Sequence, residues 1–192
     1  MKIALVIALE DESQGINGYP VYLSGCGKVN ATIATMKAIY DGADLIINYG
    51  SAGAITDVKG LVEVTGAVDR DMDARALNCL LGETPFEKGV LIGTETIVCG
   101  TGDSFSTSKP EIECDIVDME MYAIAKTCNK MGVEFRSFKY ISDHVEHDGN
   151  QDHWDENKHR GNILFQKLLE KEYGEPVEKV SQSRVGKDLD LL

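Results

Sequence analysis

The chain has 192 residues, which suits one domain with a single sizeable core, and 43% hydrophobic with 27% charged residues is an ordinary globular composition. The formal charge of −13 at pH 7 argues against a nucleic-acid partner, because proteins that bind phosphate backbones are normally basic. No segment is long enough to span a membrane, so we expect no membrane partner either.

The opening segment, MKIALVIALEDE, is predicted to be a buried strand over Ile3–Leu9 rather than a signal peptide. Its apolar run is short, no small-residue cleavage site follows it, and three acids come directly after. The five cysteines form no C-x-x-C pair. We therefore expect reduced thiols and a cytoplasmic location, and neither a disulfide framework nor a zinc site.

Further along, apolar runs that are typical of strands alternate with helical patterns. The other predicted strands are Leu45–Asn48, Val90–Ile92, Ile97–Val98, Ile116–Val117 and Phe135–Ile141, and the predicted helices are Val29–Tyr40, Met119–Met131 and Asp155–Glu172. This order indicates an α/β fold with a mixed central sheet. Periodicity is lost from Gly174, so we predict one domain over residues 1–173 and a loose extension over 174–192.

Acidic and small residues follow several of the predicted strands. In open α/β sheets, ligands bind at the carboxyl ends of the strands, so these residues are expected to converge on one site. Each alone has a structural explanation, since Asp and Ser are also favoured helix caps. Carboxylates can accept from the vicinal hydroxyls of a sugar, and glycosidic cleavage uses one acid and one base. The acids are Glu10, Asp11, Glu12, Asp118, Glu120 and Asp143, and the small-residue segments are 49–54 and 100–106.

Six segments occur in one order: ALEDE, SGCGKVNA, NYGSAGA, GTGDSF, VDMEMYAIA and ISD. Together they resemble the purine nucleoside phosphorylase and nucleosidase superfamily, most closely its methylthioadenosine/S-adenosylhomocysteine nucleosidase branch, from Met1 to about Asp143. The resemblance implies a three-layer α/β sandwich with a mixed central sheet that acts on purine ribosides without a cofactor. It also implies a homodimer or higher homo-oligomer, with neighbouring chains completing the pocket.

The resemblance assigns roles to individual residues. Asp143 resembles the general acid that protonates N7 of the departing purine, and Glu12 resembles the base that activates water. Glu120 resembles the residue that binds the ribose 2′- and 3′-hydroxyls. The other positions carried over are Met119 beside the sugar, Phe105 stacked on the base, Ser106 at the base edge, Ser51, Ala52 and Gly53 as a turn beside the ribose, and Ser142 orienting Asp143.

Some of these assignments have structural alternatives. Phe105 could fill the core, and the acids of ALEDE could be helix-start carboxylates favoured by the helix dipole. Asp118 is interpreted as a structural hydrogen-bonding group. The segment Gly25–Lys28 lacks phosphate-loop spacing and is interpreted as a strand-to-helix turn.

The chain departs from the family pattern in two places. Only a dozen residues separate Glu12 from Gly25, so the pocket is expected to be more open, or closed by a partner subunit. Residues 68–89 have a distinctive sequence where the family has a loop near the subunit contact. In this segment, Arg70 and Arg75 are candidates to bind a phosphate or carboxylate of the substrate. The favoured alternative is that they form surface ion pairs with Asp71 or Asp73.

A polar segment near the C-terminus contains all four histidines. An EF-hand starting at Asp148 would need glycine in place of His153 and glutamate in place of His159, so we reject it. A zinc site built from His144 and His147 is a less favoured interpretation of this segment than a polar loop and helix start beside the active site. We expect no metal.

Hydrolysis is favoured over phosphorolysis. Phosphorylases of the superfamily place glycine and arginine after the first strand, whereas this chain carries Glu10, Asp11 and Glu12 there. Three carboxylates would repel a phosphate dianion. The sequence thus predicts hydrolysis of the N-glycosidic bond of a purine nucleoside. The alternatives are a phosphate-dependent phosphorylase and a catalytically silent nucleoside-binding protein.

Overall fold

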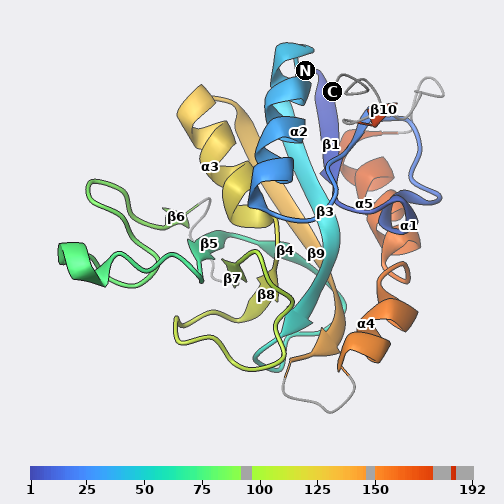
Figure 1. Cartoon of the computed structure of the whole chain (residues 1–192). Coiled ribbons are helices and arrows are strands. Elements are labelled where there is room, and N and C mark those ends of the chain that lie inside the picture. The colour runs from blue at the N-terminus through green and yellow to red at the C-terminus, as the bar shows by residue number, and fades with distance from the viewer. Residues whose placement is uncertain (92–96, 146–149, 175–182, 185–192) are drawn as a thin grey trace, which may run out of the picture.

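The computed structural model describes residues 1–91, 97–145, 150–174 and 183–184. Its strands form one mixed sheet, with α2 and α3 on one face and α1, α4 and α5 on the other (Figure 1). The predicted α/β class with a mixed central sheet is therefore confirmed.

The described residues contain strands and helices in alternation. The strands are β1 (Ile3–Ile7), β2 (Val21–Leu23), β3 (Leu45–Ala54), β4 (Leu61–Val64), β5 (Gly66–Asp69), β6 (Val90–Leu91), β7 (Val98–Thr101), β8 (Ile116–Asp118), β9 (Glu134–His144) and β10 (Ser183–Arg184). The helices are α1 (Glu10–Ser13), α2 (Lys28–Tyr40), the 3₁₀ turn η1 (Arg75–Leu77), α3 (Met121–Met131), α4 (Asn150–Asn157) and α5 (Asn162–Tyr173).

The long strand β3 is the centre of the sheet. It pairs in parallel with β1 and with β9, and its last residues pair antiparallel with β8. The strand order along the sheet is β10-β2-β1-β3-β8-β7-β5-β6, with β9 on β3 and β4 on β9. This topology places the carboxyl ends of β1, β3 and β9 at one edge and brings the end of β8 beside them.

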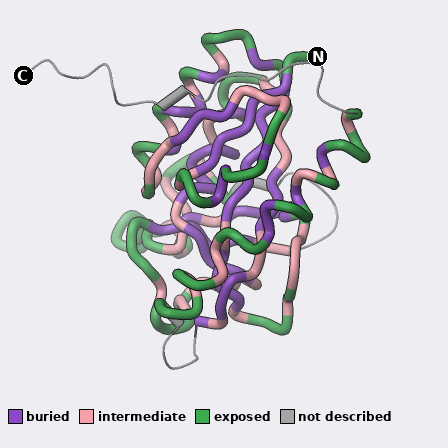
Figure 2. Tube along the Cα trace, turned by 90° about the vertical axis from the view of Figure 1, so that its right-hand side faces the viewer, coloured by how far each residue is buried: buried purple, intermediate pink, exposed green. Residues whose placement is uncertain are grey.

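Apolar packing fills both faces of the sheet, and the strands are the most buried part of the chain (Figure 2). On one face, α2 turns Ala31, Ala34 and Ala38 inward, and these small side chains allow the helix to lie close to the sheet. On the other face, Phe165 of α5 stacks on Tyr49 of β3 with ring centroids 4.1 Å apart.

Strands β3 and β9 are both longer than predicted. Ser51, Ala52 and Gly53 belong to β3 rather than to a turn, because the ladder with β9 continues to Ala54 with an irregularity after Ala52. A Cβ atom at Gly53 would lie 3.0 Å from Cγ2 of Val145. This glycine therefore permits a close approach between chain segments, and the small residues do not mark a turn.

The predicted helix Asp155–Glu172 is wrong, because two helices, α4 and α5, occupy this region. The break ends at Gly161, where a Cβ atom would lie 2.5 Å from Cβ of Tyr140. Contact with the sheet at this glycine thus sets the start of α5, which local periodicity does not show. In the predicted loose extension, Ser183–Arg184 pairs with β2 as β10. Ile92 of the predicted strand Val90–Ile92 lies outside the described residues.

Candidate active site

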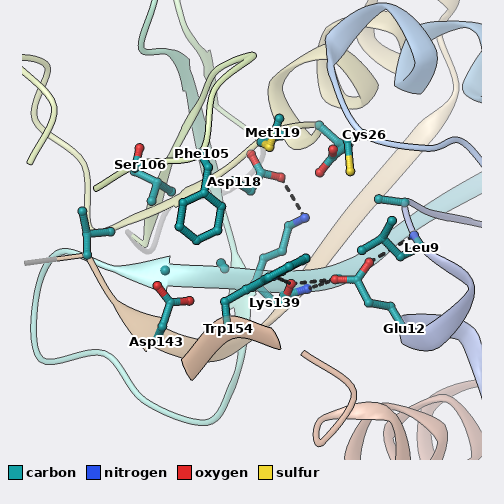
Figure 3. A pocket seen from close by; sticks show the side chains of 18 of the residues that line it. Leu9, Glu12, Cys26, Phe105, Ser106, Asp118, Met119, Lys139, Asp143 and Trp154 are labelled. Carbon is teal, nitrogen blue, oxygen red and sulfur yellow. Dashed lines mark hydrogen bonds and ion pairs between the residues drawn. The ribbon is translucent and has the colours of Figure 1, made fainter. Parts of the chain in front are cut away.

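A cavity that is partly open to solvent lies where the ends of β1, β3, β8 and β9 meet (Figure 3). Nine of the ten predicted site residues line it. They are Glu12, Ser51, Ala52, Gly53, Phe105, Ser106, Met119, Glu120 and Asp143. The tenth, Ser142, is buried and its Oγ donates to Oδ1 of Asp143 at 2.7 Å. The predicted residues are therefore brought together at one place.

Glu12 is the only buried acid of the three at the start of α1, since Glu10 and Asp11 are exposed. Its Oε1 accepts from the backbone N–H of Ser51 at 2.8 Å and from Ser51 Oγ at 2.6 Å, and its Oε2 accepts from the N–H of Leu9 at 3.2 Å. Burial raises the pKa of Glu12, although these hydrogen bonds act in the opposite direction. The carboxyl is fixed in orientation and has an increased proton affinity, as a general base requires.

Glu120 occupies the N-cap position of α3 but its side chain does not cap the helix. Instead, Oε1 accepts from the N–H of Gly27 at 2.9 Å, in the turn between β2 and α2. Burial, with a contribution from nearby Asp118, raises the pKa of Glu120 to about 8. This carboxyl therefore retains its proton more readily at neutral pH than an ordinary glutamate does.

Asp118 and Lys139 form a buried ion pair in the cavity wall, with Lys139 Nζ 2.8 Å from Asp118 Oδ2. Thr101 Oγ1 and the N–H of Met121 also donate to Asp118, in agreement with a structural hydrogen-bonding group. Burial disfavours the ionised carboxyl, but the ammonium of Lys139 lowers the pKa of Asp118 overall. Lys139 was not predicted as a site residue, although a lysine inside an apolar strand is itself a signal of a buried counter-ion.

Asp143 lies within β9, so it is not a helix cap. Its side chain is buried, and a Cβ atom at Gly53 would lie 3.2 Å from its Oδ2. In the view of Figure 3, the carboxyls of Asp143 and Glu12 lie on opposite sides of the cavity. A ligand between them can meet one carboxyl on each side.

Three aromatic residues line the cavity, Tyr49 of β3, Phe105 and Trp154. Phe105 is 38% exposed and therefore does not fill the core. It meets Trp154 of α4 edge to face, with ring centroids 5.8 Å apart and an interplanar angle of 69°. Trp154 was not predicted as a site residue, because its polar surroundings on α4 give no local signal and only the fold brings it to the cavity.

Next to the cavity, Lys28 connects three chain segments. Its Nζ lies 2.8 Å from Asp69, 2.5 Å from Asp71 and 3.8 Å from Asp103, and its N–H donates to Asp103 Oδ1. Gly25–Lys28 is indeed a strand-to-helix turn, as predicted. Lys28 therefore holds this turn against the end of β5 and against the loop that carries Phe105.

The two candidate arginines differ. Arg75 pairs with Asp73 at 2.6 Å and with Glu111 at 2.5 Å on an exposed surface, which is the favoured alternative for this residue. Arg70 lines the cavity and donates to the carbonyl of Ser104, so it supports the loop before Phe105. Its predicted alternative partner, Asp71, is instead paired with Lys28.

Within the part of the chain that the structure describes, no three His, Cys, Asp or Glu side chains are grouped so that they could hold a metal ion. His147, one of the two histidines considered for zinc, lies outside the described residues. None of the described helices has the length and hydropathy to cross a bilayer.

Comparison with known proteins shows which family this chain belongs to. The family described as the Phosphorylase superfamily matches residues 59–171, more than half of the chain. The chain belongs to the phosphorylase superfamily. The predicted resemblance to this superfamily is thus confirmed.

Curated relatives in the superfamily are named 5′-methylthioadenosine/S-adenosylhomocysteine nucleosidase. The relative from Staphylococcus haemolyticus is 33% identical over 150 residues, which cover 62% of this chain and 66% of the relative. The relative from Marinomonas sp. is 28% identical over 151 residues, which cover 62% and 65%. The chain thus spans about two thirds of the length of the curated relatives that it matches.

Solved structures share the superfamily fold. A Helicobacter pylori nucleosidase of this name, a D198N mutant with 5′-methylthioadenosine in its active site, has a TM-score of 0.77 and 22% identity over 88% of this chain and 96% of that chain. Futalosine hydrolase of Helicobacter pylori has a TM-score of 0.78 and 21% identity over 88% and 96%. Two differently named hydrolases match equally well, so the fold leaves the substrate open.

The raised pKa of Glu120 predicts a pH-dependent stability for this superfamily member. The folded protein binds the Glu120 proton up to about pH 8, whereas the unfolded chain releases it near the ordinary value of 4.5. Between these values the folded state binds more protons, so the free energy of unfolding contributed by Glu120 falls as pH rises.

Urea unfolding of wild type and Glu120→Gln at pH 5, 6, 7 and 8 measures this contribution. The difference between them is expected to change steadily across that range, and parallel profiles would contradict the assignment. The exposed residue Glu156 supplies the control, Glu156→Gln.

Replacing Lys139 by methionine is expected to destabilise the protein by about 3–5 kcal/mol, because the change leaves Asp118 charged and unpaired in the wall. The matched control is Lys126→Met, which removes an ion pair with Glu87 and is expected to have a much smaller effect, because solvent screens that pair. Urea unfolding at pH 7 compares the two. The double variant Lys139→Met with Asp118→Asn should recover part of the loss, and equal effects of the two lysine changes would show that the pair is unimportant.

Proposed function

We propose that the protein hydrolyses the N-glycosidic bond of a purine nucleoside of the methylthioadenosine or S-adenosylhomocysteine type, and releases the free base and a ribose derivative. The observation that carries this proposal is the presence of Glu12, Glu120 and Asp143 on the wall of one cavity. Two carboxyls that can act from opposite sides of a bond, with a third for the sugar, are the groups that this reaction needs. The names of the curated relatives agree with it.

In the proposed reaction, Asp143 donates a proton to N7 of the purine while the bond between C1′ and N9 breaks. Glu12 accepts a proton from a water molecule, whose oxygen forms the new bond to C1′. One proton leaves Asp143 and one arrives at Glu12, so exchange with solvent restores both groups after product release. Positive charge that develops on the ribose ring is stabilised by the ionised carboxylate of Glu12.

The remaining cavity residues hold the substrate in this proposal. Glu120 binds the ribose 2′- and 3′-hydroxyls, with Met119 against the sugar. Phe105 stacks on the base, and Ser106 bonds to the base edge through its backbone. Ser51, Ala52 and Gly53 lie beside the ribose on β3, and Ser142 orients Asp143.

Water is the proposed nucleophile because of the charge at the end of β1. Glu12 lines the cavity there, with Glu10 and Asp11 beside it at the surface. Of the two cations in the described lining, Lys139 is paired with Asp118 and Arg70 donates to the carbonyl of Ser104. A phosphate dianion would meet carboxylates with few free cations to offset them. A phosphorylase and a silent nucleoside-binding protein are therefore outcomes that the following test must exclude.

A chromatographic assay of base release tests the function. The substrates are methylthioadenosine, S-adenosylhomocysteine, adenosine, inosine and AMP, each with and without phosphate. Release of free base without phosphate supports the proposal and identifies the substrate. Release only with phosphate would show a phosphorylase. Binding without release, followed through the fluorescence of Trp154 in the cavity wall, would show a silent nucleoside-binding protein.

We further propose that the chain acts as a homodimer or higher homo-oligomer in the cytoplasm. The location is supported by the five cysteines, all of which are free thiols. The assembly is supported by large apolar side chains that are exposed on one face of α2 and on the segment between β5 and β6. Burial of such apolar surface against a second copy would stabilise an assembly. Sedimentation equilibrium measures the mass, and a monomer at micromolar concentration would contradict the proposal. The exposed residues are Val29, Ile33, Tyr40, Leu77, Leu80 and Phe86.

A further inference from the structure

The single tryptophan of the chain is linked by hydrogen bonds to the proposed base. Trp154 Nε1 lies 2.9 Å from Ser51 Oγ, which lies 2.6 Å from Glu12 Oε1. An indole N–H can only donate and an ionised carboxylate can only accept. Ser51 Oγ therefore accepts from Trp154 and donates to Glu12, so chemistry alone fixes the direction of the chain of hydrogen bonds.

Asn157, the last residue of α4, and Lys158, in the turn after it, contact the segments that hold the proposed acid and base. Asn157 Nδ2 donates to the carbonyl of Ser142 at 3.1 Å, which is part of the peptide that joins Ser142 to Asp143. Lys158 Nζ lies 3.6 Å from Asp11, the neighbour of Glu12, and 4.6 Å from the centre of the Trp154 ring. Positions 154, 157 and 158 are three and four residues apart, and the N–H of Lys158 still donates to the carbonyl of Trp154, so the three lie on one face of α4 and the turn that ends it.

We propose that this face of α4 positions both reacting carboxyls, with Trp154 as the positioning residue for Glu12 and Asn157 for Asp143. The inference rests on the proposed hydrolysis. When the indole N–H of Trp154 donates to Ser51 Oγ, the hydroxyl proton of Ser51 is directed to Glu12. The Glu12 carboxylate then keeps one orientation (Figure 3). Without that donor, the Ser51 hydroxyl can rotate away and Glu12 loses a bond that favours its ionised form.

Trp154 is uncharged, so replacing it changes no charge in the cavity. The titratable groups that face Glu12 from the surrounding elements stay in place. They are Lys139 of β9, Glu120 at the start of α3, Tyr49 of β3 and Cys26 in the turn before α2. A change in the pH profile of a Trp154 variant therefore reports the lost hydrogen bond.

The test uses Trp154→Phe, which keeps an aromatic ring and removes the N–H. Because this is the only tryptophan in the chain, β-(3-benzothienyl)alanine can also replace it throughout the protein, with sulfur in place of N–H and nearly the same shape. Both changes are expected to lower kcat by about fivefold to tenfold, the effect of one hydrogen bond, with KM within about twofold. The acid limb of the kcat profile is expected to move to higher pH.

Two controls separate positioning from packing. His153→Ala changes an exposed neighbour on α4 and is expected to leave kcat and the pH profile unchanged. In the Ser51→Ala background the chain of hydrogen bonds is already broken, so Trp154→Phe is expected to add little to the loss. Additive effects of the two changes would overturn the proposal for Trp154.

A readout without turnover distinguishes this inference from the proposed function. Titration of the Glu12 side-chain carboxyl by ¹³C NMR is expected to give a higher pKa in Trp154→Phe than in wild type. If wild type releases no base, the proposed hydrolysis fails, and the positioning role with it, even if the titration still shows the hydrogen-bond chain. If wild type is active and both the titration and the kcat profile are unchanged in the variant, only the role of Trp154 fails.

Asn157→Leu tests the other end of the face. The change removes the donor to the Ser142 carbonyl and is expected to slow release of purine bases. It is expected to spare p-nitrophenyl riboside, whose leaving group departs as a stable anion and needs no acid. Equal slowing of both substrates would overturn the link to Asp143.

Discussion

The variant Asp143→Asn is expected to lose about 10²–10⁴-fold in kcat for purine nucleosides, the usual contribution of a general acid. Asparagine has nearly the same shape and can still accept from Ser142 Oγ, which lies 2.7 Å from Oδ1 in the wild type. It has no proton that it can transfer to N7. Binding is expected to change little, and quenching of Trp154 fluorescence by the nucleoside measures it independently of turnover.

The leaving group makes this test specific. Hydrolysis of p-nitrophenyl riboside by Asp143→Asn is expected to stay within about tenfold of wild type, because that leaving group needs no protonation. The control is Asp152→Asn, on the exposed part of α4. Equal losses with both substrates would indicate a distorted site, and unchanged release of purine bases would remove Asp143 from the role of acid.

The parts of the fold that local sequence could predict are those governed by burial. The apolar runs of β1 and β9 and the small inward face of α2 follow from it directly. The site residues could be predicted because they come at or near strand ends, which the topology gathers at one edge. Glu12 was separated from Glu10 and Asp11 by family resemblance alone, and the structure adds the physical reason, which is burial.

The parts that could not be predicted depend on contacts between distant segments. Trp154 reaches Ser51 across 103 positions, and no local pattern distinguishes it from a surface residue. The end of β3 was mistaken for a turn because glycine and serine occur both in turns and where chain segments pack closely. The close approach of Val145 to Gly53 is visible only after folding. The same holds for Gly161, where a side chain would collide with Tyr140 of β9.

Replacing Glu12 by alanine is expected to reduce hydrolysis by about 10²–10⁴-fold, because no other group in the described part of the cavity is held in its place against Ser51 and Leu9. Burial raises the pKa of Glu12. A base acts only when it is ionised, so the wild-type rate is expected to fall as pH decreases through this raised value. The acid limb of the pH profile is expected to disappear in Glu12→Ala.

Rescue by an external nucleophile separates the role of a base from a role in binding. Azide attacks carbon without losing a proton, so it needs no base, and the gap left by the Glu12 side chain gives it access. Adding azide to Glu12→Ala is expected to restore release of the purine and to form a ribosyl azide. Azide is not expected to rescue Asp143→Asn, since protonation of the base is still missing there. Rescue of both variants, or of neither, would contradict the separate roles of the two carboxyls. Rescue of Glu12→Ala alone would show that Glu12 takes the proton from water and that Asp143 supplies the proton to the purine.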